Sequence, residues 1–112
     1  MARVTADGLD GYADRDTYPD GTVVRVFSQR TSDPAYSSGW AYALHYGSQK
    51  PDPPRTLPDG TIRRYDNAHE DTKGHELHVA DQPTQTIQFP GMVDFYERFW
   101  SVIPKQAFDP TA

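Results

Sequence analysis

Three of the four histidines of this 112-residue chain lie in one short polar segment, residues 63–78. The segment also holds two adjacent arginines, a tyrosine, an asparagine, a lysine and several carboxylates. Imidazole changes protonation near neutral pH and binds metal ions when neutral, so such a segment can transfer protons, hold a metal or bind an anion. No other stretch of the sequence offers comparable chemistry, and we therefore expect the functional site here.

Cleavage of RNA without a metal is one chemistry that these residue types allow. It needs a base for the 2′-hydroxyl, an acid for the leaving oxygen and cations that stabilise the crowded phosphate. Arg64 with His69 is the pair that we favour for these roles. The full set of catalytic candidates is Arg64, Asp66, His69, His75 and His78, and the substrate-binding candidates are Arg63, Tyr65, Asn67 and Lys73.

Ordinary structural roles compete for the same residues. If a strand continues to Asp66, Arg64 and Asp66 share one face, and Arg63 and Tyr65 share the other. Arg64 and Asp66 would then form a surface ion pair, and Asn67 would cap a turn. Tyr65 would either stack on a nucleic acid base or fill the sheet.

A metal site is the rival chemistry. Asp66, His69, His75 and His78 together offer the mixed nitrogen and oxygen ligands that suit zinc, manganese or nickel. Their spacing matches no strong metal motif, and solvent-exposed histidines with ordinary hydrogen bonds explain them equally well. We favour the metal-free chemistry, so the sequence predicts neither a metal nor another cofactor.

A β-sheet is expected to position this segment. β-branched runs and alternating apolar residues predict four strands, at residues 22–31, 38–47, 61–66 and 86–89. In the second strand the aromatic residues occupy one face and His45 the other, so His45 is expected to be structural. The third strand is expected to pair with the second, because consecutive strands are usually neighbours.

A helix is expected to follow the last strand and to end at Pro104. The residues at helical spacing are Met92, Phe95, Phe99, Val102 and Ile103. The sequence thus predicts an α+β fold, a twisted antiparallel sheet of about four strands with this C-terminal helix packed on its aromatic face. The expected core residues are Tyr42, Leu44, Phe95 and Phe99, with Trp40 and Trp100 as further candidates.

Length and composition predict one domain. Residues 1–21 hold five Asp and three Gly without apolar periodicity, which predicts an acidic flexible or loosely docked arm before a single α+β domain at residues 22–112. A net charge of -5 argues against tight nonspecific DNA binding. The lack of cysteine and of an apolar span favours a cytoplasmic protein without a membrane segment. Only three of 16 acidic residues are Glu and three of 11 basic residues are Lys, a bias typical of halophilic proteins.

The run Arg-Tyr-Asp-Asn-Ala-His at residues 64–69, followed by His75 and His78, resembles the TumE family of toxins from toxin–antitoxin operons. The resemblance takes in the preceding strand and the final helix, and so spans residues 38–103. The run lacks the proline that family members carry before the histidine. The resemblance implies a small toxin that acts on RNA or translation, a ribonuclease or translation inhibitor, encoded beside a helix-turn-helix antitoxin.

The sequence leaves a second functional class open, a noncatalytic binding protein whose sheet docks a partner. For the antitoxin, Trp100 and Phe108 are candidate exposed anchors, because large aromatic residues dominate interface energetics. The alternative is core packing for Trp100 and a disordered tail at Phe108.

Overall fold

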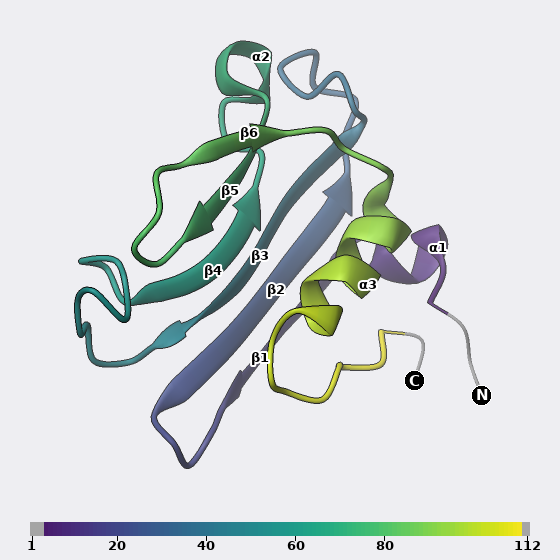
Figure 1. Cartoon of the computed structure of the whole chain (residues 1–112). Coiled ribbons are helices and arrows are strands. Elements are labelled where there is room, and N and C mark those ends of the chain that lie inside the picture. Colours follow the sequence, from purple (N-terminus) through teal and green to yellow (C-terminus); the bar gives the residue numbers. More distant parts are fainter. Residues whose placement is uncertain (1–3, 111–112) are drawn as a thin grey trace.

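A computed structural model describes residues 4–110 of the chain. Six antiparallel strands form one sheet in which each strand pairs with the next along the chain (Figure 1). The strands are β1 (Tyr12–Thr17), β2 (Thr22–Arg30), β3 (Trp40–Ser48), β4 (Thr61–Asp66), β5 (His75–Val79) and β6 (Gln85–Ile87). The helices of this described part are α1 (Ala6–Leu9), α2 (Glu70–Lys73) and α3 (Met92–Ser101).

The core lies between the sheet and α3, which crosses one face of the sheet (Figure 1). Phe95 and Phe99 of α3 are buried in the same cluster as Tyr42 and Leu44 of β3. The ring of Tyr65 on β4 lies 5.1 Å from that of Phe95, measured between centroids. These contacts confirm the predicted α+β fold, the C-terminal helix and its position on the aromatic face.

The predicted number of strands is wrong, because the sheet has six strands rather than about four. One additional strand, β1, falls in the segment expected to be a flexible arm. It is mostly exposed, so it shows no apolar alternation, and its backbone pairs with β2. The other, β5, lies inside the histidine-rich segment, where Glu76 and His78 occupy alternate positions and hide the strand pattern.

The predicted aromatic anchors are packed against each other. Trp100 is only 7% exposed, and its ring centroid lies 4.8 Å from that of Phe108. The main-chain carbonyl of Phe108 also accepts a hydrogen bond from the Tyr96 hydroxyl (2.9 Å). The prediction of an exposed Trp100 is therefore wrong, and the alternative of core packing is confirmed.

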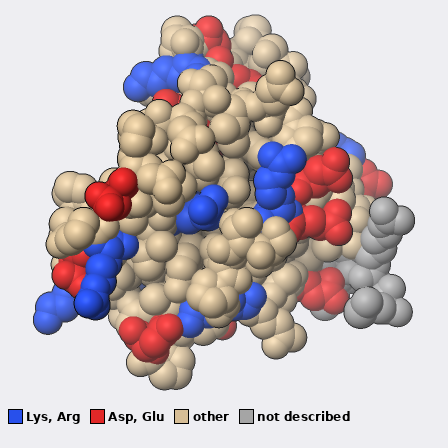
Figure 2. All heavy atoms as spheres, viewed as in Figure 1, with Lys and Arg blue, Asp and Glu red and all other residues tan. Residues whose placement is uncertain are grey.

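The sheet has a second face, called the open face below, that no helix of residues 4–110 covers (Figure 1). Residues paired directly across antiparallel strands point to the same side. His45 of β3 pairs with Arg64 of β4, and both point away from the buried Tyr42, Leu44 and Tyr65. On the α3 side, charged groups of both signs are scattered among uncharged side chains (Figure 2).

Asn67 joins the end of β4 to β3. Asn67 is buried, with only 1% of its surface exposed. The amide oxygen accepts a hydrogen bond from the Tyr42 N–H (3.0 Å), and the amide nitrogen donates one to the Trp40 carbonyl (2.6 Å). Asn67 therefore does not cap a turn but satisfies two backbone groups of the neighbouring strand.

We expect Asn67→Ala to lower the free energy of unfolding by about 2–6 kcal/mol, because it leaves two backbone groups unpaired and each costs about 1–3 kcal/mol. Urea unfolding followed by tryptophan fluorescence measures the change. Thr72→Ala is the control, because the Thr72 hydroxyl makes an exposed bond to the His69 carbonyl. Equal stability of the two variants would show that Asn67 does not anchor the strands.

Candidate functional site

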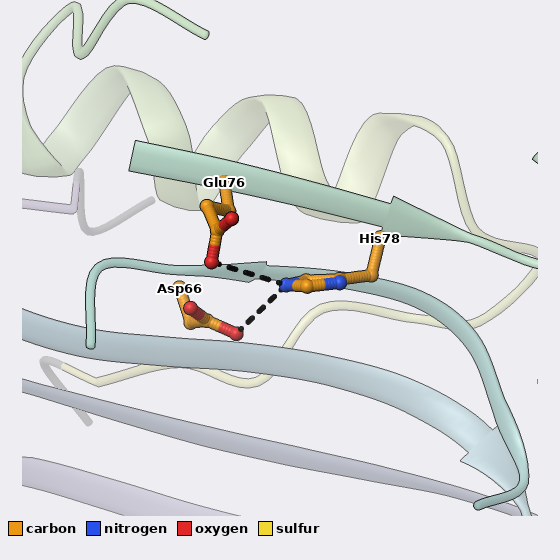
Figure 3. Close-up of side chains that lie close together, drawn as sticks. All are labelled: Asp66, Glu76 and His78. Carbon is orange, nitrogen blue, oxygen red and sulfur yellow. Dashed lines mark ion pairs between the residues drawn. The ribbon is translucent and has the colours of Figure 1, made fainter. Parts of the chain in front are cut away.

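Four polar side chains, Arg64, Asp66, Glu76 and His78, form a cluster on the open face where β4 pairs with β5. We call it the open-face cluster. Nε of Arg64 donates to Oδ2 of Asp66 (2.8 Å). Nε2 of His78 lies 3.4 Å from the same oxygen and 3.7 Å from Oε1 of Glu76 (Figure 3). The predicted ion pair of Arg64 with Asp66 is thus one part of a larger arrangement.

His78 presents one ring nitrogen to the two carboxylates. Its Nδ1 lies 3.2 Å from the Thr84 hydroxyl, which fixes the plane of the ring. Its Nε2 is buried and has no hydrogen-bond partner among residues 4–110. An imidazole oriented in this way can transfer a proton or ligate a metal through Nε2.

The structure separates His75 from His78, although both lie on β5. Residues three apart in a strand point to opposite faces. On the core side, Nδ1 of His75 lies 2.7 Å from the Tyr42 hydroxyl and Nε2 lies 2.6 Å from a Glu70 oxygen. Burial lowers the pKa of His75, and Glu70 opposes that shift. The ring also stacks on Phe89, so the contacts of His75 are those of a core residue.

His69 and Lys73, at the two ends of α2, also lie apart from the open-face cluster. His69 precedes the helix in a left-handed conformation (φ 62°) and is exposed. Lys73 is exposed in the last turn of the helix. Within residues 4–110, no hydrogen bond or ion pair joins His69 to Arg64. The favoured pair of Arg64 and His69 is therefore not formed in this structure.

Arg63 and Tyr65 occupy the core side of β4, on the face opposite Arg64 as predicted. Nη1 of Arg63 donates to the Tyr65 hydroxyl across 3.5 Å. Tyr65 is only 3% exposed, so its ring fills the sheet and has no free face for a base. The side-chain amide of Asn67 is hydrogen-bonded to the backbone of β3. These three substrate-binding candidates thus make structural contacts.

The sequence did not single out three residues of the open face. Glu76 belongs to the cluster, and Arg15 and Arg25 extend the basic surface toward β1. Arg15 pairs with Arg25 across β1 and β2, and Arg25 pairs with His45 across β2 and β3. The alternation of polar side chains along each strand is the signal that marks them, but only the strand register brings them together.

An open concavity of about 790 Å³ lies over these strands, with Arg15, Arg25, His45 and Arg64 in its lining. We call it the open-face groove. Nε2 of His45 lies 3.2 Å from the Thr61 hydroxyl. Burial, followed by the charges of Arg25 and Arg64, lowers the pKa of His45 to about 4. His45 is therefore neutral at neutral pH.

The family comparison accounts for nearly the whole chain. The model of the family described as Toxin TumE matches residues 3–107. The chain belongs to this family. The match confirms the resemblance expected from residues 38–103 and indicates a toxin role, which implies an antitoxin partner. Neither the curated proteins nor the solved structures contain a significant match.

No helix among residues 4–110 is long and apolar enough to cross a membrane.

The run at residues 64–69 ends β4 and continues into the turn before α2, and the structure divides its side chains between two faces. Arg64 and Asp66 point to the open face, whereas Tyr65 and Asn67 are buried between structural elements.

The side chains that could hold a metal ion differ from the predicted set. Asp66, His69, His75 and His78 do not meet, but one ligand atom each of Asp66, Glu76 and His78 lies within 4.8 Å of the others (Figure 3). Neighbouring ligands of a tetrahedral ion with bonds of about 2.1 Å are separated by about 3.4 Å. The spacing of His78 from the two carboxylates fits such an ion, and binding would occupy its free nitrogen.

We expect the fold to lose stability as pH falls from about 6.5 toward 4. An unfolded histidine titrates near 6.5, whereas the pKa of folded His45 is about 4, so the unfolded chain binds more protons in this window. The free energy of unfolding therefore rises with pH across it. His45→Gln should flatten this dependence in urea unfolding, leaving the slope due to His75, whose pKa is also lowered by burial. An unchanged slope would show that His45 is not held neutral.

Proposed function

We propose that the chain is a toxin that cleaves RNA without a metal, through the open-face cluster. Membership of the TumE toxin family supports the toxin role. The observation that carries the chemistry is the convergence of a guanidinium, an imidazole and two carboxylates, with His78 Nε2 at 3.4 Å and 3.7 Å from carboxylate oxygens. These groups are the base, the acid and the cation that cleavage of an RNA phosphodiester needs.

In the proposed reaction Glu76 takes the proton of the 2′-hydroxyl, and the 2′-oxygen forms a bond to phosphorus. The bond from phosphorus to the 5′-oxygen breaks, and protonated His78 donates its proton to that oxygen. The products are a 2′,3′-cyclic phosphate and a 5′-hydroxyl. Arg64 stabilises the charge on the nonbridging oxygens, while Asp66 orients it through the 2.8 Å bond to Nε.

This assignment keeps Arg64, Asp66 and His78 from the predicted catalytic set and adds Glu76. It replaces His69 by His78 because His78 lies beside the carboxylates, whereas His69 is exposed just before α2. The side chains of the cluster are 13–28% exposed. They are thus partly shielded from water, which strengthens their interactions with a bound phosphate.

We further propose that the chain acts in the cytoplasm and that its antitoxin is a helix-turn-helix protein that covers the open face. A chain with a net charge of -5 is poorly suited to bind promoter DNA itself. Acidic or aromatic antitoxin side chains would compete with RNA phosphate for Arg64 and its neighbours. The buried Trp100 is not part of this surface.

Expression of the wild-type chain should arrest growth, and Arg64→Ala or His78→Ala should relieve the arrest. Loss of a general acid or base lowers a rate by about 10² to 10⁴. Growth curves after induction measure the effect, and circular dichroism establishes that each variant folds. His69→Ala and Lys73→Ala are matched controls at the two ends of α2 and should remain toxic.

A folded His78→Ala variant with full toxicity would remove the proposed acid. If His69→Ala relieved the growth arrest, the result would instead support Arg64 and His69, the pair favoured from the sequence. Co-expression of the product of an adjacent gene should restore growth and yield a stable complex. Failure of every adjacent gene product to associate would count against the helix-turn-helix partner.

Cleavage of RNA by the purified chain should survive EDTA and be inhibited by zinc, because zinc would occupy the nitrogen of His78 that must donate a proton. His78→Ala and Glu76→Ala should each weaken zinc binding at least tenfold in calorimetry, with His69→Ala as the unaffected control. Loss of cleavage under chelation, restored by zinc or manganese, would favour the second candidate function, a metal site formed by Asp66, Glu76 and His78.

A further inference from the structure

One basic residue from each of five adjacent strands stands in a single line across the open face. Direct cross-strand pairs define this basic row, and each member is paired with the next. The row runs Arg15, Arg25, His45, Arg64 and His78. Since neighbouring strands lie about 4.8 Å apart, the row spans about 19 Å. Residues far apart in the sequence therefore form a track perpendicular to the strands.

A second line on the same face contains an exposed aromatic ring. Phe27 is 40% exposed, although it lies on β2, which is paired with a strand on each side. Its direct partners are Ala13 on β1 and Ala43 on β3, whose small side chains leave the ring uncovered. All three residues line the open-face groove together with Arg25. The groove thus combines a flat aromatic surface with the first four members of the basic row, and His78 lies beyond it on β5.

The charges of the groove favour an anion along this row. Within residues 4–110, Arg15 and Arg25 make no ion pair, whereas Arg64 is paired with Asp66 and Asp59. Burial is the main cause of the lowered pKa of His45, and the positive charges of Arg25 and Arg64 lower it further. Asp14 and Asp59 also line the groove, but three arginines outnumber them.

We propose that the open-face groove binds single-stranded RNA, with the backbone along the basic row and one base stacked on Phe27. This inference rests on the proposed function and names its substrate class. Phosphates held by Arg15 and Arg25 would lead the strand to Arg64 and His78, where cleavage takes place. Bases of a double helix are stacked on one another and paired, so only an unpaired strand can place a base on an exposed ring.

The inference can be tested with a short fluorescent RNA that carries 2′-O-methyl groups and so cannot be cleaved through the 2′-oxygen. Fluorescence anisotropy should show binding to the wild-type chain and weaker binding of a duplex of the same length. Phe27→Ala should weaken binding of the single strand about tenfold, the size expected for loss of one stacked base. Arg25→Ala should weaken it and reduce the slope of log affinity against log salt by about 0.7.

Two matched controls exist on other surfaces. Arg55→Ala removes an arginine whose side chain is 86% exposed, and Val102→Ala removes an apolar side chain from a residue that is 46% exposed. Both should bind RNA as the wild type does. Unfolding curves for all four variants exclude a general loss of structure.

The outcomes separate this inference from the proposed function. If the single strand binds through Phe27 and Arg25 but unmodified RNA is not cleaved, the substrate class stands and the proposed chemistry fails. If unmodified RNA is cleaved while Phe27→Ala and Arg25→Ala bind normally, the groove is not the RNA site. Equal affinity for the duplex would also overturn the inference.

Discussion

The register between β3 and β4 is the constraint on which the rest of the molecule depends. It pairs His45 with Arg64 and Leu44 with Tyr65, so that polar side chains face one way and apolar side chains the other. A shift of one residue would exchange the two sets and bury Arg64 in the core. The two hydrogen bonds of the buried Asn67 amide to β3 oppose such a shift.

The sequence predicted the core well because apolar periodicity is a local signal. The alternation around Tyr42 and Leu44 identified β3, and the spacing of Phe95 and Phe99 identified the helix that covers it. The strand at residues 61–66 and its pairing with β3 followed from the same logic. Local patterns also placed Arg64 and Asp66 correctly on one face.

The histidines show why the site was harder to predict than the core. His75 and His78 lie three residues apart, a spacing that brings side chains together on a helix but separates them on a strand. The segment was not expected to contain β5, so nothing distinguished the two. Arg15 and Arg25 were missed for a different reason, since they approach Arg64 only through pairings among four strands. Such neighbours cannot be found without the register.

The one-sided packing of the sheet has a consequence for how such a protein changes through evolution. The buried apolar residues that join helix and sheet lie on the α3 side, whereas the open face carries the polar cluster and the groove. Substitutions at exposed positions such as Phe27 cost little free energy of folding. Descendants of one ancestral chain can therefore diverge in what the open face recognises while they keep the same scaffold.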